Sequence, residues 1–308
     1  MKKFIIGIDA GGTKTRACAY DAQTHTLLSQ ISTGSGNPSS SGPAAIDEIT
    51  RAAEELCASI DGECVCAAVG AAGLSAQIAG TPARDLLKTT LRTLPCMKNA
   101  GIQVLTDAEL ALYANFEPSP DRTSAIVISG TGSAVFAFSG ETVIRSGGWG
   151  NILGDSGSGY HVGLLLLKEL TRMIDTADDS VPELHRTLCN SGCLSGTDLR
   201  SAIVDLVYRQ PKSAAAALAP VVADLAKTWE TARQILQNSA SALADDAEHV
   251  FRRSAHSDRQ LAYTGGFITG CKLFREIFIN ELNRRFPGIR IRPAVDPTLG
   301  VISLYQRS

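Results

Sequence analysis

The sequence lacks any long run of apolar residues. Its first apolar stretch, residues 4–8, ends at Asp9, whereas a signal peptide needs about 7–15 such residues and a membrane span about 18. We therefore expect neither of these segments. An excess of one charge is also absent, since 29 Lys and Arg stand against 31 Asp and Glu. The totals thus show no field that would bind nucleic acid.

Paired cysteine motifs are missing as well. The chain has eight cysteines but no C-x-x-C pair, which is typical of reduced thiols in a cytoplasmic protein. Strand alternation at Cys64-Val65-Cys66 predicts that both thiols lie on one face of a sheet. The alternative use of cysteine is an iron–sulfur ligand set, for which Cys189 and Cys193 are the only suggestive pair.

Glycine, by contrast, is abundant, with 28 among 308 residues against a usual ~7%. Residues 4–9 and 15–20 are predicted strands, joined by a turn at Gly11 and Gly12. A second hairpin of like design follows about 120 residues later, with strands at 125–128 and 134–138 around a Gly/Thr/Ser tip. Two such copies, each opening a stretch of strands and helices, predict a duplicated α/β domain.

The length is typical of about two domains, and Pro118-Ser119-Pro120 is the best boundary between them. Apolar periodicity predicts the remaining elements. Strands are expected at 65–69, 102–105 and, as the final strand, 260–263; helices are expected at 46–60, 84–94, 107–115, through most of 159–250, and at 298–305.

The first glycine turn fits neither standard nucleotide motif. Gly7 and Gly12 have the Walker A spacing, but Thr13 stands where the lysine belongs, and the turn leads into a strand rather than a helix. Two interpretations remain, a phosphate cradle of another kind and a plain tight hairpin. The cradle is favoured by the neighbouring Asp9, Lys14 and Thr15 and by the second hairpin.

These motifs together resemble a known family. Residues 7–15 (GIDAGGTKT) resemble the first phosphate motif of the superfamily of sugar kinases, actin and heat-shock chaperone ATPases. Residues 129–133 (SGTGS) resemble its second phosphate motif, and residues 264–266 its adenosine motif. Residues 147–160 are similar to the signature of the N-acetylglucosamine kinase branch of the BadF/BadG-type ATPases. The resemblance runs from Gly7 to Leu299.

The resemblance implies an α/β fold of two duplicated actin-like (ribonuclease H-like) ATPase domains with a nucleotide cleft between them. Residues 1–117 would form the first domain, with a helix at 298–308 packing back on it, and residues 118–297 the second, with a helical insertion. ATP and Mg²⁺ are the implied cofactors. The ATP-binding residues would be Gly11, Gly12, Thr13, Lys14, Thr131, Gly132, Gly265 and Gly266.

Two aspartates would carry the chemistry. Asp9 would hold Mg²⁺, in part through water, because this hard ion takes one or two carboxylates plus phosphate oxygens; the alternative is a turn-forming aspartate. Asp107 follows a predicted strand and opens a helix, so it would lie where open α/β sheets bind ligands. There it would accept the proton of the attacking hydroxyl. Its alternative role is an ordinary helix N-cap.

The sugar would be bound by residues that match family positions: Asn37, Ser75, Asp107, Gly148, Trp149 and Asp155. Asn37 suits a sugar because its amide both donates and accepts hydrogen bonds. Trp149 would offer an apolar face, and Asp155, expected to be exposed in a glycine-rich loop, would bind hydroxyls or only stabilise the turn. The family's usual Glu after this aspartate is replaced by Ser156, which leaves the choice of hexose derivative open.

The favoured function is therefore an ATP-dependent amino-sugar kinase that phosphorylates the 6-hydroxyl of N-acetylglucosamine. Glucosamine and N-acetylmuramic acid remain as alternative substrates. An activator ATPase of a radical dehydratase and a non-enzymatic, actin-like or chaperone-like nucleotide switch remain as alternative functions. The resemblance also implies a cytoplasmic homodimer.

Overall fold

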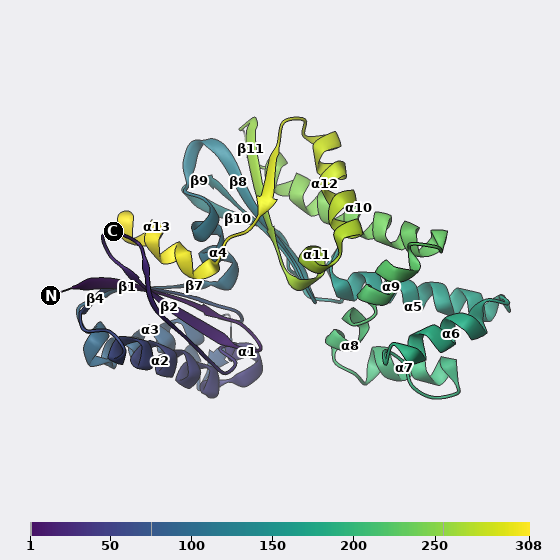
Figure 1. Ribbon diagram of the computed structural model, residues 1–308, viewed down its shortest axis with the longest axis horizontal. Coiled ribbons are helices and arrows are strands. Elements are labelled where there is room, and N and C mark those ends of the chain that lie inside the picture. Colours follow the sequence, from purple (N-terminus) through teal and green to yellow (C-terminus); the bar gives the residue numbers. More distant parts are fainter. Residues whose placement is uncertain (1, 75, 255) are drawn as a thin grey trace. The chain divides into compact units, whose positions relative to one another are not determined.

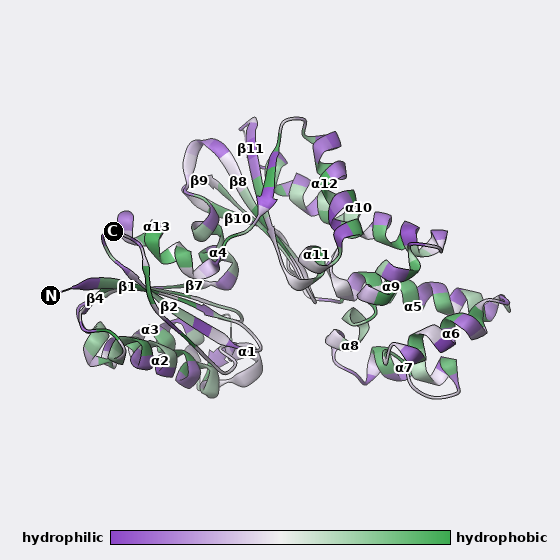
Figure 2. Ribbon diagram, in the orientation of Figure 1, coloured by the Kyte–Doolittle hydropathy of each residue, from purple (hydrophilic) through white to green (hydrophobic). Residues whose placement is uncertain are grey.

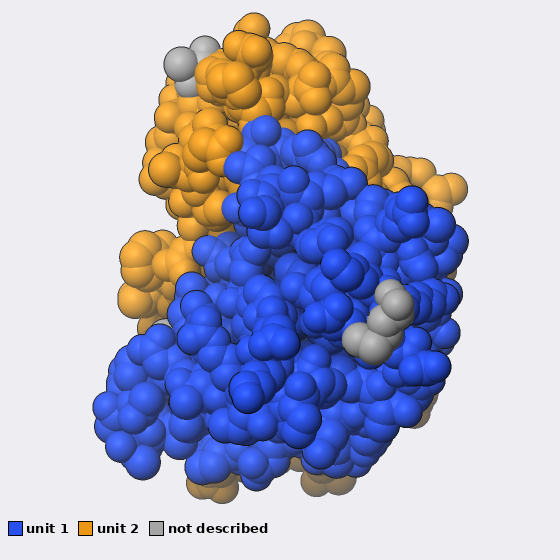
Figure 3. All heavy atoms as spheres, turned by 90° about the vertical axis from the view of Figure 1, so that its left-hand side faces the viewer, with its two compact units in different colours: residues 1–118, 294–308 blue, residues 119–293 orange. Residues whose placement is uncertain are grey.

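The chain forms two compact α/β units in the computed structural model (Figure 1), which describes residues 2–74, 76–254 and 256–308. The first unit contains the chain up to Pro118 together with Ala294–Ser308, and the second contains Ser119–Pro293 (Figure 3). The chain therefore leaves the first unit once and returns to it with its last residues.

Each unit is built on a five-stranded sheet, and the two sheets repeat one topology. The orders are β3-β2-β1-β4-β7 and β10-β9-β8-β11-β12. In both, the first three strands pair antiparallel and the last two join them in parallel. The strands are β1 (Lys3–Ala10), β2 (Thr15–Asp21), β3 (Leu27–Thr33), β4 (Glu63–Ala71) and β7 (Gly101–Thr106), then β8 (Ser119–Ser129), β9 (Ser133–Gly140), β10 (Thr142–Gly147), β11 (Asp258–Thr264) and β12 (Arg290–Pro293).

Helices cover both faces of the first sheet, as a partly parallel sheet requires. Alternation along β1 sends Phe4 and Ile6 into one apolar core and Ile5 into the other. The first core lies under α2 (Pro43–Ala58) and α3 (Ala83–Thr93), the second under α4 (Asp107–Asn115) and the strongly hydrophobic α13 (Gly300–Gln306; Figure 2). Shorter elements are α1 (Pro38–Ser41), β5 (Gln77–Ile78), β6 (Thr81–Pro82), and the 3₁₀ turns Pro95–Met97 and Pro297–Leu299.

The second unit carries a large helical segment between β10 and β11. Its longest helix, α10 (Glu230–Arg252), packs against β8, β9 and β10 and against α12. One continuous apolar core joins this sheet to the helices. The other helices are α5 (Gly159–Asp175), α6 (Val181–Asn190), α7 (Leu199–Tyr208), α8 (Lys212–Ala216), α9 (Ala219–Leu225), α11 (Gly266–Gly270) and α12 (Lys272–Arg285).

The C-terminal segment is built into the first unit by close contacts. A Cβ atom at Gly7 would overlap the carbonyl group of Thr298. The Tyr20 hydroxyl lies 2.7 Å from Oγ1 of Thr298, and Arg16 pairs with Asp296 at 2.5 Å. Glycine at position 7 is therefore what lets this segment cross β1.

The prediction that Cys64 and Cys66 share a face is wrong. Phe4 pairs with Cys64 and Ile5 with Cys66, so Val65 is an extra residue in a β-bulge. Because a bulge shifts the alternation by one residue, Cys64 joins the core under α2 and Cys66 joins the core under α13. All eight cysteines are free thiols.

Several strands were not predicted. β3 and β10 complete the two antiparallel halves, and β12 follows β11, so the strand expected at 260–263 is not the final one. None of the described helices combines the length and the apolar character that a bilayer span demands.

Candidate active site

Two aspartates meet at one edge of the first sheet. β1, β4 and β7 are parallel neighbours, so their carboxyl ends lie together. Asp9 pairs with Gly70 near the end of β1, and Asp107 follows the last residue of β7. A Cβ atom at Gly70 would lie 3.2 Å from Cα of Asp107 and 2.6 Å from Cβ of Leu110. Glycine at position 70 thus allows α4 to bring Asp107 toward Asp9.

Burial raises the pKa of both carboxyl groups. For Asp9 the pKa reaches about 6, because desolvation and the negative charges of Asp107 and Asp296 outweigh the nearby Arg16 and Lys14. Desolvation also raises the pKa of Asp107, against the hydrogen bond that its carboxylate accepts from the Ala108 N–H at 2.9 Å. Each carboxylate is therefore a stronger proton acceptor than an exposed aspartate.

Asp107 is not the N-cap of its helix. Thr106 holds that position, and its side chain accepts from the Glu109 N–H at 3.2 Å, while the Glu109 carboxylate accepts from the Thr106 N–H at 2.8 Å. This capping box satisfies the end of the helix without Asp107. The capping role that the sequence left open for Asp107 thus belongs to its neighbour.

The first glycine turn lies between β1 and β2 of the same unit. The Gly11 N–H donates to the Lys14 carbonyl at 3.0 Å, and Gly12, Thr13 and Lys14 are exposed. Among the described residues, no acceptor is bonded to the N–H of Gly12 or Thr13. A tip of exposed amides beside a lysine is suited to binding an anion.

Asn37 lies against this turn. The Gly36 N–H donates to the Gly11 carbonyl at 3.0 Å, and Nδ2 of Asn37 lies 3.9 Å from the position of a Cβ atom at Gly12. Its Oδ1 atom caps α1 by accepting from the Ser39 N–H at 2.9 Å. The first unit therefore brings Asn37 to the glycine turn, and the amide nitrogen is left to donate. Ser75, the other predicted sugar residue of this unit, lies outside the described residues.

The second glycine turn lies at the end of β8 in the second unit. The Gly130 N–H donates to the Gly132 carbonyl at 2.9 Å, and the Gly130 carbonyl accepts from the Gly159 N–H at 2.8 Å. Gly265 has φ +109°, and a Cβ atom there would overlap the backbone of Ser129. This close approach joins the predicted adenosine motif to the second phosphate motif.

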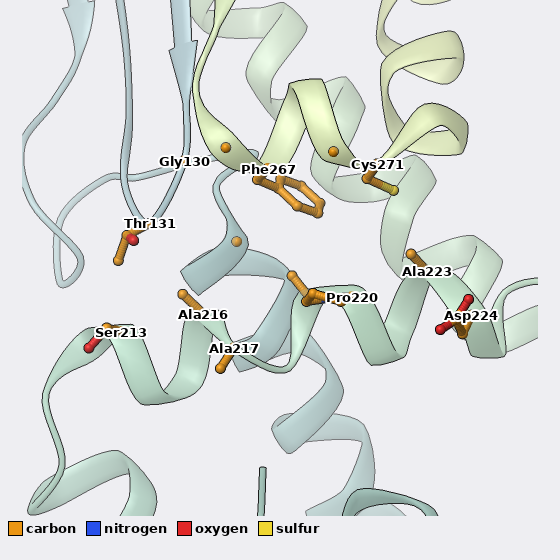
Figure 4. A pocket seen from close by; sticks show the side chains of 14 residues that line it. Gly130, Thr131, Ser213, Ala216, Ala217, Pro220, Ala223, Asp224, Phe267 and Cys271 are labelled. Carbon is orange, nitrogen blue, oxygen red and sulfur yellow. The ribbon is translucent and has the colours of Figure 1, made fainter. Parts of the chain in front are cut away.

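A cavity of about 590 Å³ opens beside this junction (Figure 4). Gly130 and Thr131 line it from the turn, Gly266 from α11, and Ser213 from α8. Thr131 and Ser213 lie toward one end and Asp224 toward the other. The cavity is large enough for a nucleoside, and its Thr131 end is bordered by the turn that resembles a phosphate motif.

Asp155 is buried rather than exposed, so that expectation is wrong. Only 4% of the residue is accessible, and it adopts φ +60°. Its Oδ1 atom accepts from the Ser133 N–H at 3.0 Å, and its Oδ2 atom lies 3.5 Å from Nζ of Lys212. The Ser133 hydroxyl also donates to the Ser156 carbonyl at 2.7 Å. The carboxylate thus supports the back of the second glycine turn.

Trp149 stands in the preceding loop with 67% of its surface exposed. Gly147, Gly148 and Gly150 all have positive φ, which glycine adopts without strain. The Arg145 guanidinium lies 5.2 Å from the centre of the indole ring. The end of β10 and the loop after it thus present one cation, Arg145, and one aromatic side chain, Trp149, to solvent.

The sequence did not single out Asp296, Arg16 or Lys212. Asp296 raises the pKa of Asp9 although 287 positions separate them, and Arg16 lowers it. The only local signal was Asp296 before Pro297, a typical start of a helical turn. Lys212 belongs to no recognisable motif, since only a run of small residues follows it.

The fold class follows from this geometry. Two units that repeat one sheet topology, each with a glycine turn after its first strand, have the actin-like ATPase fold predicted from the sequence, and solved structures confirm it. The chain belongs to the BadF/BadG/BcrA/BcrD ATPase family, whose profile matches residues 6–302. Use of ATP follows from this membership.

Two curated relatives match nearly the whole chain. The N-acetylmuramic acid/N-acetylglucosamine kinase of Clostridium acetobutylicum is 29% identical over 94% of this chain and 93% of its own. The N-acetyl-D-glucosamine kinase of Dictyostelium discoideum is 28% identical over 100% and 99%.

Solved structures share the fold at lower identity. A Chromobacterium violaceum protein, proposed to be an N-acetylglucosamine kinase, is 20% identical with a TM-score of 0.73 over 98% of this chain and 99% of its own. A ROK family glucokinase of Streptomyces griseus, solved with glucose and AMPPNP, is 15% identical with a TM-score of 0.57 over 99% of both chains.

Proposed function

We propose that this protein is an ATP-dependent amino-sugar kinase that transfers the γ-phosphoryl group of ATP to the 6-hydroxyl of N-acetylglucosamine. The observation that carries the proposal is the half-buried carboxylate of Asp107, which does not cap its helix because Thr106 does, and which lies at the edge of the sheet beside Asp9. Both curated relatives, whose names include N-acetylglucosamine kinase, support the same reaction.

In this mechanism Asp107 accepts the proton of the 6-hydroxyl as the sugar oxygen attacks the γ-phosphorus. A bond forms between that oxygen and phosphorus, the bond to the β-phosphate oxygen breaks, and ADP leaves with the electron pair. Asp107 then returns its proton to solvent. The raised pKa of Asp107 suits a group that must hold a proton briefly.

The donor set of the first unit fits Mg²⁺. Among the described residues no three acidic, cysteine or histidine side chains are grouped to hold a metal alone, but Mg²⁺ characteristically takes one or two carboxylates with phosphate oxygens and waters. Asp9 would hold the ion, in part through water, next to the exposed amides of the first glycine turn. When bound, Mg²⁺ would neutralise phosphate charge during transfer.

The remaining assignments follow the two glycine turns. We propose that the phosphates bind the backbone and hydroxyls of Gly11, Gly12, Thr13, Lys14, Thr131 and Gly132, and that the adenosine binds at Gly265 and Gly266. The cavity beside Gly266 supports the latter. Asn37, Ser75, Gly148 and Trp149 are proposed to bind the sugar, and a sugar contact of Asp155 stays a prediction.

An acidic amino sugar is the second candidate substrate, and Arg145 favours it. The guanidinium is exposed beside Trp149, and no carboxylate pairs with it within the described residues. A 3-O-carboxyalkyl group, as in N-acetylmuramic acid, would give this cation a partner. Replacing Arg145 by alanine should then lower kcat/KM for N-acetylmuramic acid more than for N-acetylglucosamine.

An ADP-release assay over N-acetylglucosamine, N-acetylmuramic acid, glucosamine and glucose tests the proposal. We expect sugar-dependent ADP release with an N-acetylated amino sugar as the best substrate, and a 6-phosphate product by NMR. ATP hydrolysis that no sugar accelerates would overturn the kinase and favour the activator ATPase. The proposed cytoplasmic location is compatible with free thiols and with ATP as a substrate. The proposed homodimer would be tested by analytical ultracentrifugation.

A further inference from the structure

An ion pair links the helical segment of the second unit to its glycine turn. Nζ of Lys212, the first residue of α8, lies 3.5 Å from Oδ2 of Asp155. The other oxygen of the same carboxylate accepts the Ser133 N–H at 3.0 Å. The Asp155 carboxylate therefore connects Lys212 to the backbone of the turn.

The buried carboxylate poses an electrostatic problem for that turn. Its two oxygens lie 2.8 and 2.9 Å from the position that a Cβ atom would take at Gly132. The Asp155 side chain is only 5% exposed, so water screens its charge poorly. A polyphosphate bound at Thr131 and Gly132 would be repelled unless a cation compensates this charge.

Lys212 is placed to supply that compensation. Ser213, the next residue, lines the cavity together with Thr131, at the same end (Figure 4). The Lys212 side chain is 45% exposed, so its ammonium group is open to a ligand. An ammonium group has three donors, of which Asp155 takes one.

We propose that Lys212 is a phosphate-binding residue of the nucleotide site, and that Asp155 positions it. The ammonium group binds a phosphate oxygen of the nucleotide whose base and ribose occupy the 590 Å³ cavity. Asp155 acts through Lys212 and Ser133, holding the cation and the turn in one arrangement. This role rests on the proposed use of ATP.

Nucleotides with and without phosphates test the role of Lys212. Binding of ATP, ADP and adenosine is measured by calorimetry for the wild type, Lys212→Ala and Lys212→Arg. Lys212→Ala should weaken ATP and ADP about 10- to 100-fold, the range for a charged hydrogen bond, and leave adenosine within about twofold. Lys212→Arg should restore most of the affinity. Lys168→Ala, which removes an exposed lysine of α5 that does not line the cavity, is the matched control and should change nothing.

A second substitution tests the positioning role of Asp155. In Lys212→Ala the Asp155 carboxylate remains buried with its charge uncompensated. The double variant Lys212→Ala, Asp155→Asn should therefore bind ATP about threefold more tightly than Lys212→Ala alone. The amide oxygen can still accept the Ser133 N–H, which keeps the turn supported. A double variant that binds ATP more weakly than Lys212→Ala would contradict the charge argument.

The outcomes separate this proposal from the proposed function. If the wild type binds ATP and phosphorylates a sugar while Lys212→Ala binds ATP normally, only the role of Lys212 is overturned. Equal weakening of ADP and adenosine would show that Lys212 merely supports the fold, and would also overturn it. Failure of the wild type to bind ATP would instead overturn the kinase.

Discussion

Asp107 raises the pKa of Asp9 across the edge of the first sheet, although the two carboxylates come from β1 and from the helix after β7. Such a like-charge pair costs stability in the absence of a ligand. It is relieved when a cation binds or when one partner takes up a proton, and both events belong to phosphoryl transfer. The two carboxylates thus lower the stability of the ligand-free protein while they serve its activity.

Asp107→Asn should lower kcat about 10²- to 10⁴-fold, the usual contribution of a general base. Binding of ATP should remain within a few-fold, because the amide keeps the size of the side chain. Asp85→Asn, an exposed acid in the first turn of α3, is the control and should be fully active. Near-normal turnover of Asp107→Asn would show that another group takes the proton.

Asp9→Asn should stabilise the metal-free protein while it abolishes activity. Because folding raises the pKa of Asp9 to about 6, the folded state binds this proton more tightly than the unfolded state. The stabilising effect of protonation is present below about pH 4 and is lost as the pH rises through 6. Urea unfolding in EDTA should show a gain of ~2–3 kcal/mol for the variant at pH 7.5 and a smaller gain at pH 4.

Asp21→Asn is a control that should change the stability in the opposite direction. Hydrogen bonds from the N–H groups of Thr24 and Gln23 lower the pKa of Asp21, so its charge stabilises the folded state at neutral pH. This substitution should destabilise the protein at pH 7.5. If Asp9→Asn is no more stable than the wild type at that pH, the burial of its charge is overstated.

Substitutions in the two glycine turns should weaken the binding of ATP more than the binding of the sugar. Gly12→Val adds bulk beside exposed amides, and Thr131→Val removes a hydroxyl from the cavity. Each should raise the KM for ATP while the dissociation constant of the sugar, measured without nucleotide, changes little. Loss of sugar binding with ATP binding intact would reverse the assignment of the motifs.

Gly73→Ala should impair sugar binding more than Gly80→Ala. Both glycines have positive φ, +72° and +79°, so alanine is strained at either position by roughly 1–2 kcal/mol. Only at Gly73 would the new Cβ overlap Oδ1 of Asn37 and Oγ of Ser39. We therefore expect similar losses of stability from the shared strain, an additional loss at Gly73, and a raised sugar KM for Gly73→Ala alone.

Trp149 should report sugar binding by fluorescence. It is one of two tryptophans and it is exposed, whereas Trp229 is partly buried against the apolar core of the second unit. N-acetylglucosamine should change the emission of the wild type and of Trp229→Phe but not of Trp149→Phe. A response that follows Trp229 would place the sugar away from the glycine-rich loop.

Local pattern was enough to predict a duplicated α/β domain, whereas the actin-like fold was implied by the family resemblance of the motifs. The apolar hairpin at β1 and β2 and its copy at β8 and β9 carry both the strand signal and the duplication. β3, β10 and β12 were missed because their residues alternate weakly: β12 is only four residues, two of them arginines. Each of these strands pairs with the strand that precedes it in the chain, β2, β9 or β11, and such pairing is not encoded in the periodicity of the strand itself.

The candidate site was less accessible to sequence reasoning. The position of Asp107 could be predicted because a strand leads directly into its helix. The cap at Thr106 was missed, although Thr106 and Glu109 have the spacing of a capping box. The burial of Asp155 depends on contacts with Ser133 and Lys212, which are distant in sequence. Similarly, no local pattern links Asp296 to Asp9, since their electrostatic interaction exists only because the segment Ala294–Ser308 returns to β1.

That return sets an order of assembly during synthesis. The second unit is one continuous segment, Ser119–Pro293, and all of its partners are present once that segment has left the ribosome. The first unit, although its translation begins first, lacks Thr298 against Gly7 and Asp296 against Arg16 until the segment Ala294–Ser308 emerges. Domains usually fold in the order of their synthesis. Here the unit that is begun first is completed after the second, and the edge that holds Asp9 waits for the segment Ala294–Ser308.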